Sequence, residues 1–563
     1  MLLKPLKSER GVATFIAVIL VVMLTLLGLA VLTTSDDEIG IAGNTMNEMR
    51  AFYAAEAGLE RSSALLLTEF DTTGLPPVGP FPIVTWDTLN GCLVLDSIAD
   101  DGPAEIRVLT TGTLAGLNAQ VKSYSMTTEA TNISNRSSMQ LSQFFEAALV
   151  PLFQFAVFYG NDLEIAPGPE MNLIGRVHSN GNLYIQANNT LRMDSYVTAS
   201  GTIIHGRKGP GGVGSGDVFI KNASGDTVAM KQDGNWIDGT HDDWYDSSLV
   251  LWEGRVRDSA HGQSELNVPL TQSAFGDPHK LIERAEDNPD SYEDNAKNTL
   301  KFIDRTAYVR ADTSQPWVDV TSDMISLGVI EFDDDAFTDQ REGHDVDVME
   351  FDVQKAYDEG YLDPNKKNVV FYSDENGDYP AVRVRNASEL GGPLTIASEN
   401  PVYTLGDFNS VSKKPASILA DAVTFLSGAW DDSKSSGSKN NRIASETTVN
   451  CSYLTGNVET TASNYNGGFE NLPRFLEKWS GVPFNWKGSA VNLWNSRQAD
   501  GMWSGTYYSP PIRNWSYDTA LDHPDSLPPE TPVIRVFQRT GWQQHHVGYE
   551  EEEWYGHEES ETY

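Results

Sequence analysis

The chain has 563 residues, and 40 Lys and Arg against 79 Asp and Glu give it a formal net charge of −39 at pH 7. Such an acidic chain would repel a polyphosphate, which disfavours nucleic-acid binding, and its length exceeds what one hydrophobic core organises. With only two cysteines, Cys92 and Cys451, it is neither a disulfide-rich nor a thiolate–zinc scaffold. We expect both cysteines to be small packed residues, and a long-range bridge between them stays open.

The first predicted element is a membrane-spanning helix over residues 12–35. A short basic segment, residues 1–11, precedes it, and no ionisable side chain occurs from Gly11 to Ser35. This run exceeds the roughly 20 apolar residues that cross a bilayer as a helix, and the about 7–15 of a cleaved secretory signal. Basic residues before it and three acidic residues after it, at 36–38, predict a cytoplasmic N-terminus and an exported remainder.

The helical pattern continues over residues 36–70. Apolar side chains recur there at three- and four-residue intervals, Ala is frequent and Pro is absent. The pattern predicts an amphipathic continuation that packs on its own globular domain, so that one helix would reach nearly 90 Å at about 1.5 Å per residue. Gly40 and Gly43 are its candidate kink points.

Three features of this N-terminal region occur together: a basic leader ending in Arg10-Gly11, the uncharged run, and the segment DDEIGIAGNTMNEMRAFYAAEAGLE at 36–60. Together they resemble a type IV prepilin, specifically the PilX-type minor pilin or pilus-assembly group. The resemblance implies that a prepilin peptidase cuts after Gly11 and leaves Val12 as the mature N-terminus. It also implies that the helix bundles with other pilins while the downstream domain is displayed outside.

Two residues depart from the usual pilin pattern. The first mature residue would be Val12, where Phe or Met is usual, and the fifth would be Ile16, where major pilins have Glu. The resemblance assigns that glutamate a pairing with the amino group of a neighbouring subunit, which an isoleucine cannot form. The departure favours a minor subunit over a repeating one.

Residues 71–150 are predicted to form a proline-rich linker and a small β-rich, pilin-like region. The expected elements are strands at 106–108, 113–117 and 121–126, a loop at 127–138 and a buried strand within 151–160.

Residues 151–230 and 393–463 share a different sequence pattern, in which Gly and Asn separate short aliphatic triplets. This pattern favours a parallel β-solenoid in two parts, interrupted by a polar acidic insertion at 231–392. A run of antiparallel hairpins is the alternative, because Asn180-Gly181 is also a hairpin turn signal.

The C-terminal part divides into an aromatic-rich block at 464–540 and an acidic tail at 541–563, which we expect to be disordered. The aromatic block is interpreted as a cap that closes the end of the solenoid, and an aromatic platform for a glycan or a partner protein is the alternative.

Few residues suggest chemistry, and no catalytic motif is found. His178 is expected to make a structural hydrogen bond at a corner, and Asp333–Asp335 to be a solvated face rather than a cation or catalytic site. Asp374, Asn376 and Asp378 have the alternating oxygen spacing of a calcium loop, but the EF-hand glycine and final glutamate are missing, so a turn is preferred. The histidines near the C-terminus could bind metal only opportunistically; they are His545, His546 and His557.

The sequence therefore predicts an α+β protein, with a long pilin-like helix followed by a mostly β exported region. The predicted function is that of a minor pilin-like component of a type IV pilus, or of a related type II secretion pseudopilus, with no enzymatic activity and no cofactor. The expected partners are other pilins, a prepilin peptidase and the bacterial inner membrane, and no nucleic acid. The alternatives are a membrane-anchored polysaccharide-active β-helix enzyme and a surface adhesin.

Overall fold

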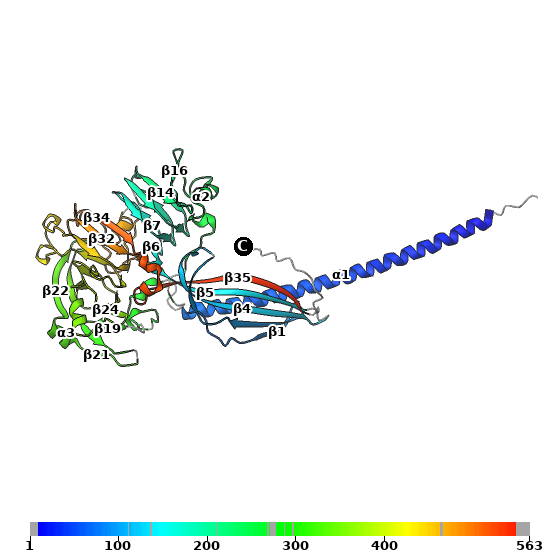
Figure 1. The fold of residues 1–563 in the computed structure, drawn as a ribbon, viewed down its shortest axis with the longest axis horizontal. Coiled ribbons are helices and arrows are strands. Elements are labelled where there is room, and N and C mark those ends of the chain that lie inside the picture. The colour runs from blue at the N-terminus through cyan, green and yellow to red at the C-terminus, as the bar shows by residue number, and fades with distance from the viewer. Residues whose placement is uncertain are drawn as a thin grey trace, which may run out of the picture.

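The structure is a computed structural model that describes residues 9–110, 112–134, 138–209, 211–266, 270, 277–286, 288–294, 298–312, 314–461 and 465–547. It consists of a helix-and-sheet unit, built from both ends of the chain, and an inserted unit, residues 152–532 (Figure 1). The α+β class predicted from the sequence is confirmed. Residues 1–8 of the predicted leader and 548–563 of the predicted tail lie outside the described residues.

The N-terminal helix α1, Glu9–Thr73, is continuous over 65 residues, or about 100 Å at 1.5 Å per residue. It passes through Gly40 and Gly43 without interruption, so neither glycine breaks it. One half projects free, and the other half lies along the sheet (Figure 1).

The sheet of the helix-and-sheet unit is antiparallel, in the order β1-β2-β4-β5-β35, with β3 also paired to β4. Its strands are β1 (Val84–Leu89), β2 (Cys92–Asp100), β3 (Glu105–Val108), β4 (Asn118–Asn132), β5 (Ser138–Pro151) and β35 (Val533–Val547). The last strand pairs with β5 along its whole length, from Val533 opposite Pro151 to Val547 opposite Ser138. The C-terminal segment thus completes a sheet that the N-terminal part begins.

The core between helix and sheet depends on small residues in the helix. Ala51, Ala54 and Ala55 are fully buried there. Gly58 lies against β2 and β4: a Cβ atom at this position would lie 2.2 Å from Asp96 Oδ1 and 2.5 Å from Thr128 Cγ2. The sheet can therefore approach the helix closely only because these side chains are small.

The inserted unit is built around a 12-stranded sheet that is parallel except at one end. In spatial order its strands are β18 (Val256–Arg257), β12 (Val197–Ala199), β9 (Arg176–Ser179), β6 (Phe155–Tyr159), β33 (Ala490–Asn492), β31 (Ser452–Thr455), β28 (Ala416–Ala420), β26 (Leu394–Ser398), β24 (Asn368–Ser373), β19 (Asn298–Ile303), β20 (Thr306–Val309) and β21 (Val318–Asp319). The predicted buried strand within 151–160 is confirmed as β6, which is buried at every residue.

Smaller sheets complete the inserted unit. They are β13-β10-β7 (Ile203–His205, Leu183–Ile185, Leu163–Ile165), β15-β14-β11-β8 (Thr227–Ala229, Asp217–Lys221, Thr190–Met193, Met171–Leu173), β22-β23-β25-β27-β29 (Ile330–Asp339, His344–Asp352, Pro380–Arg385, Val402–Leu405, Val423–Leu426), β30-β32-β34 (Thr447–Val449, Pro483–Gly488, Ile512–Tyr517) and β16-β17 (Lys231–Gln232, Asn235–Trp236). The α-helices are α2 (Trp244–Trp252), α3 (Thr321–Leu327) and α4 (Val353–Asp358). The 3₁₀ turns are η1 (Leu152–Gln154), η2 (Ser259–His261), η4 (Pro278–Leu281), η5 (Tyr292–Asp294), η6 (Asp432–Lys434), η7 (Lys439–Asn441), η8 (Phe469–Asn471), η9 (Thr519–Asp522) and η10 (Pro524–Ser526).

The hairpin interpretation of the Gly- and Asn-punctuated tract is wrong. Leu163, Leu183 and Ile203 pair in parallel at 20-residue intervals, and Asn180-Gly181 joins strands of two different sheets. The prediction of one regular solenoid is nevertheless not confirmed. The last strand of the second tract, β31, is joined to the first strand of the first tract, β6, through β33 of the C-terminal block, so the second tract does not continue the winding of the first. The antiparallel pair β14-β15 also interrupts a regular repeat within the first tract.

Several predicted boundaries are corrected by the strand pairing. Residues 113–117 form turns rather than a strand, and the predicted loop at 127–138 is mostly strand, because β4 continues to Asn132 with short Thr and Ala side chains facing the core. The predicted insertion at 231–392 contains β24 of the large sheet. The predicted block at 464–540 supplies β33 to the same sheet, and residues 541–547 of the predicted tail belong to β35.

The aromatic block packs inward. Trp479, Trp486 and Trp494 are at most 5% exposed, which agrees with a packed role rather than with an open aromatic platform. The two cysteines are free and buried in separate cores, Cys92 in the helix-and-sheet unit and Cys451 in the inserted unit, so no bridge joins them.

We expect the Gly58→Ala substitution to destabilise the helix-and-sheet unit by roughly 1–3 kcal/mol, because the added methyl group overlaps Asp96 and Thr128. Gly40→Ala is the matched control, since a Cβ atom there meets no atom within 4 Å. Thermal unfolding of the full chain in detergent measures both variants. Equal stability of the two variants would contradict the close packing at Gly58.

Candidate functional site

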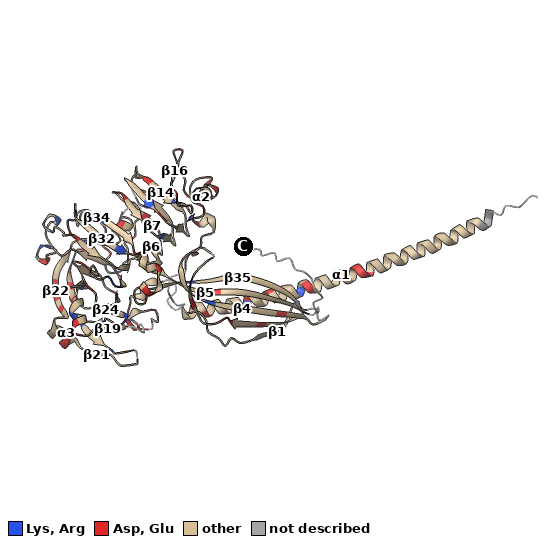
Figure 2. Cartoon of the chain, in the orientation of Figure 1, with Lys and Arg blue, Asp and Glu red and all other residues tan. Residues whose placement is uncertain are grey.

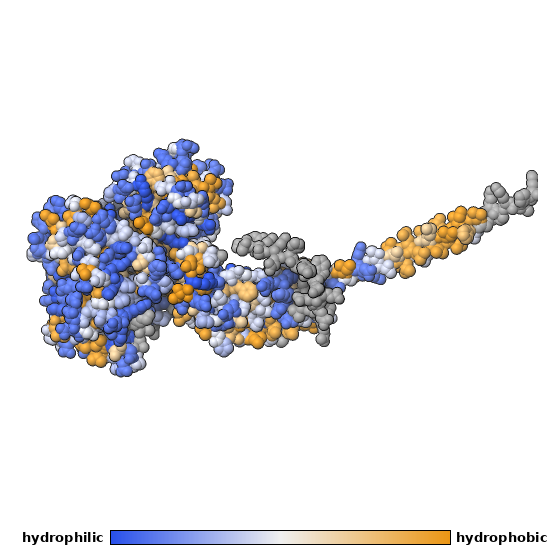
Figure 3. Space-filling view, viewed as in Figure 1, coloured by the Kyte–Doolittle hydropathy of each residue, from blue (hydrophilic) through white to orange (hydrophobic). Residues whose placement is uncertain are grey.

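The most distinctive surface of the protein is the free half of α1. The large apolar side chains from Val12 to Leu32 are between 42% and 66% exposed, and none of this apolar window is buried against the rest of the chain. Figure 3 shows them as a continuous apolar cylinder. A helix that is apolar on all sides requires either lipid or other helices around it, so this half of α1 is a candidate membrane and assembly surface.

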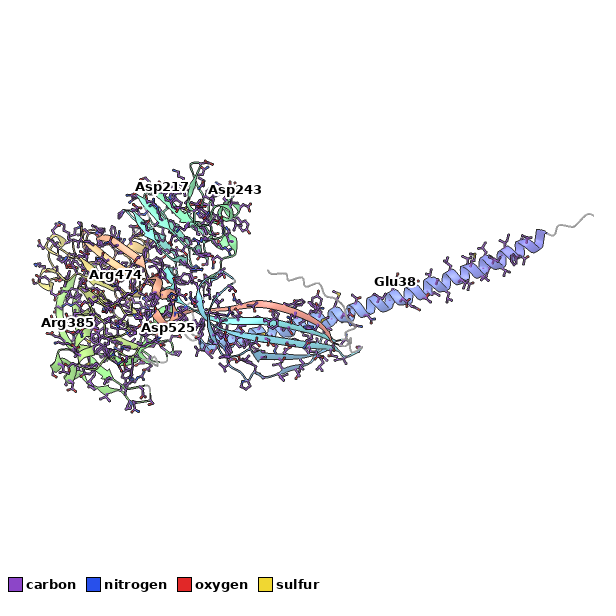
Figure 4. All side chains as sticks on the ribbon, viewed as in Figure 1. Glu38, Asp217, Asp243, Arg385, Arg474 and Asp525 are labelled. Carbon is purple, nitrogen blue, oxygen red and sulfur yellow. The ribbon has the colours of Figure 1, made fainter. Side chains whose placement is uncertain are left out.

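The polar groups of this half are arranged for an apolar environment. The hydroxyl groups of Thr25, Thr33 and Thr34 donate to backbone carbonyls one turn earlier, over 2.7–2.9 Å. Each hydroxyl is therefore satisfied within the helix and needs no water. The first charges after the run are the carboxylates at 36–38, which Figure 2 shows as an isolated acidic turn; Glu38 is labelled in Figure 4, on the free part of the helix.

The predicted processing residues lie at the beginning of this helix. Gly11 and Val12 are both within α1, and the Val12 side chain is 60% exposed. Ile16 is 54% exposed and presents hydrocarbon where the pilin pattern has a carboxylate.

The apolar surface continues past the acidic turn to the base of the sheet. Met46, Met49 and Tyr53 on α1 and Trp542 on β35 are each between 50% and 53% exposed. The ring centroids of Phe52 and Trp542 lie 6.4 Å apart, so the strand and the helix share this patch. The surface available to a neighbouring helix thus extends from the free half onto the sheet.

His178 makes the structural hydrogen bonds that were expected. Its Nδ1 lies 2.8 Å from Thr198 Oγ1 and its Nε2 lies 2.9 Å from Asn180 Oδ1. Burial lowers the pKa of His178 to about 4, so the ring stays neutral near pH 7. It joins neighbouring segments of the inserted unit.

The acidic candidates also have structural surroundings. Asp333–Asp335 lie on an exposed irregularity of β22, where Asp334 pairs with Arg305. Asp374 Oδ1 accepts hydrogen bonds from the backbone and the side-chain nitrogens of Asn376 at 2.8 and 3.1 Å, which forms a turn.

No metal site emerges from these candidates in the described ranges. The Asp378 backbone N–H donates to Asp347 Oδ2, which holds this turn against β23. Within the described part of the chain, no three His, Cys, Asp or Glu side chains are grouped as metal ligands. His545 is exposed on β35, His557 lies outside the described residues, and the side chain of His546 is not described.

One cluster that the sequence did not reveal has the composition of a nucleophilic triad. Ser248 Oγ lies 2.7 Å from His261 Nε2, and His261 Nδ1 lies 2.9 Å from Asp258 Oδ1. Ser248 is fully buried on α2, however, and its hydroxyl also donates to the Tyr245 carbonyl. The Asp258 backbone N–H donates to His261 Nδ1, so the pair forms a capping box for η2. The cluster ties α2 to η2 and offers a substrate no access to the serine. Only the three-residue spacing of Asp258 and His261 is visible in the sequence.

Glu470 is a buried carboxyl group with a raised pKa, a property often found at functional sites. Glu470 Oε1 accepts a hydrogen bond of 2.7 Å from the Ala166 backbone N–H, while burial raises the pKa of Glu470 to about 7. The nearby Glu164 accepts from the Tyr465 hydroxyl at 2.8 Å and from the Lys208 backbone N–H at 2.9 Å. Both carboxyl groups therefore hold loops of the inserted unit in place.

Comparison with known proteins bears on the N-terminal segment. Residues 10–60 match the family model described as PilX N-terminal. Among solved structures, the crystal structure of the competence-associated pilin ComZ from Thermus thermophilus matches with 11% sequence identity and a TM-score of 0.26, over 89% of this chain and 98% of that chain. No curated protein matches the chain. The PilX-type resemblance read from the sequence is confirmed for residues 10–60.

We expect Glu470→Gln to raise stability at pH 8 by on the order of 2–3 kcal/mol. The folded-state pKa of Glu470 lies above its ordinary value, so ionisation above pH 7 costs stability, and the cost vanishes as the pH falls towards 4.5. The gain should therefore disappear near pH 4.5 in thermal unfolding curves. The exposed Glu389→Gln is the control, and a gain for Glu470→Gln that does not change with pH would refute the titration.

Proposed function

We propose that the protein is a PilX-type minor pilin that anchors through the free half of α1 and displays the inserted unit outside the cell. The observation that carries the proposal is an uncharged, exposed helical half whose sequence matches the PilX N-terminal model and which continues without a break into the half that packs on the sheet.

The physical basis is that one apolar surface suits two environments. Before assembly, lipid covers the apolar half-helix; after assembly, the helices of other pilins cover it. The transfer exposes no apolar surface to water. Association with other pilins through α1 follows from this arrangement, and it supports a structural role rather than an enzymatic one.

The finer features of the proposal come from the sequence. Basic residues precede the apolar run and an acidic turn follows it. This charge pattern supports a span in the bacterial inner membrane, with the N-terminus in the cytoplasm and the inserted unit exported. A prepilin peptidase would cleave after Gly11. The same properties would serve a type II secretion pseudopilus.

Processing is tested by N-terminal sequencing of the protein from its host membrane. The mature chain is expected to begin at Val12 and to retain Met1 when the prepilin peptidase is deleted. The Gly11→Val variant should remain unprocessed in the presence of the peptidase. A wild-type chain that begins at Met1 in peptidase-containing cells would overturn the assignment of the leader.

Assembly is tested by placing a charge in the apolar run. Leu24→Arg is expected to cost about 2.5–3.5 kcal/mol of membrane insertion and to remove the protein from both carbonate-resistant membranes and sheared filaments. The matched control is Asn44→Arg, at an exposed position of α1 beyond the acidic turn. Normal recovery of Leu24→Arg in filaments would contradict the role of this surface.

A further inference from the structure

A polar cavity of about 370 Å³ lies where the two tracts of the inserted unit meet. It is lined by residues that follow four neighbouring parallel strands, with Asn180 after β9, Asn161 after β6, Asn495 after β33 and Asn457 after β31. The carboxyl ends of adjacent parallel strands form a crevice where their connections lead away in different directions. Here β6 leads to β7 and β33 leads to β34, in different small sheets.

The wall of the cavity is held by the hydrogen bonds of one buried and one half-buried amide. Asn492 Nδ2 donates to the carbonyls of Thr455 and Trp494 at 2.9 and 2.8 Å. Asn180 both accepts from and donates to the backbone of Leu266, each over 2.9 Å. A ligand would therefore meet a wall that needs little ordering on binding.

The single lysine of the cavity wall is paired with two carboxylates. Lys208 Nζ lies 3.0 Å from Asp162 Oδ2 and 2.9 Å from Glu459 Oε1. Glu164 is held by the Tyr465 hydroxyl and by the Lys208 backbone. The cavity thus presents hydrogen-bond donors and acceptors side by side, with more carboxylates than cationic groups at this end of the site.

Three exposed side chains extend the site. Asn161, Glu265 and Asn495 also line a second cavity of about 510 Å³, to which Leu493 and Trp494 contribute apolar wall. The two cavities share these residues and form one trough with a polar end and a partly apolar end. The volumes are in the range of sites for small molecules.

We propose that this trough binds a neutral saccharide of one or two sugar units. Paired amides and carboxylates match the alternating donor and acceptor character of neighbouring sugar hydroxyl groups. Carboxylates and cationic side chains both line the trough, the cationic ones being Lys208, Arg497 and Arg535, so it favours neither a strongly anionic nor a strongly cationic ligand, and the polar wall disfavours lipids. The described residues offer no grouped ligands for a metal ion. The site adds a glycan-binding activity to the displayed unit and does not depend on the role of α1.

The test is binding of cellobiose, maltose and N,N′-diacetylchitobiose to the full chain in detergent, by calorimetry and saturation-transfer NMR. We expect at least one of them to bind in the millimolar range or tighter, and the double variant Asn161→Ala/Asn495→Ala to bind at least about tenfold more weakly. Asn172→Ala is the matched control: this asparagine is exposed on β8, does not line the trough, and its substitution should leave the affinity unchanged.

The variants alter exposed side chains, and an unchanged midpoint of thermal unfolding verifies that they fold. If none of the three saccharides binds at a concentration of about 10 mM, the proposal is overturned. Undiminished binding by the double variant would overturn the location. Digalacturonate and spermidine are the comparison ligands, and binding of either in preference to the neutral sugars would overturn the assigned chemistry.

Discussion

The pairing of β35 with β5 is the interaction on which the rest of the structure depends. Without it the helix-and-sheet unit would end at β5 with an open edge of 14 residues. The pairing also brings the two ends of the inserted unit together, where the Leu152 backbone N–H donates to the Pro532 carbonyl over 2.8 Å. A domain whose ends are adjacent can be large without distorting the sheet that carries it.

The same strand also fixes the helix. Arg535 is buried, and its guanidinium donates to the Asp71 carbonyl at 3.0 Å, which satisfies a backbone acceptor at the C-terminal end of α1. Further along β35, Arg539 pairs with Glu60 at 2.6 Å. The end of the chain therefore holds the end of the helix, and the free half of α1 projects from a rigid base.

The sequence predicted the helix well, because a run without charges and an Ala-rich repeat without Pro each allow only one regular structure. It predicted the short strands within residues 151–230, since the aliphatic triplets are local features. It could not predict that β33 would lie beside β6, because more than 300 residues separate them and no local pattern records that pairing. For the same reason β35 was missed: Gln543, Gln544 and His545 look like a polar tail, although ladder bonds to β5 make them a strand. The trough was hidden likewise, since its asparagines follow strands far apart in the chain.

The size of the inserted unit constrains how copies of the protein can assemble. Helices in a bundle pack with their axes about 8–10 Å apart. The 12-stranded sheet of the inserted unit spans roughly 50 Å at 4.7–4.9 Å between strands, so adjacent subunits at one level could not both carry it. The inserted unit leaves the sheet at the end remote from the free half of α1, which keeps that half open to other helices (Figure 1). The geometry thus favours insertion among smaller pilins, with few copies in a filament, and the absent carboxylate at Ile16 agrees with that arrangement.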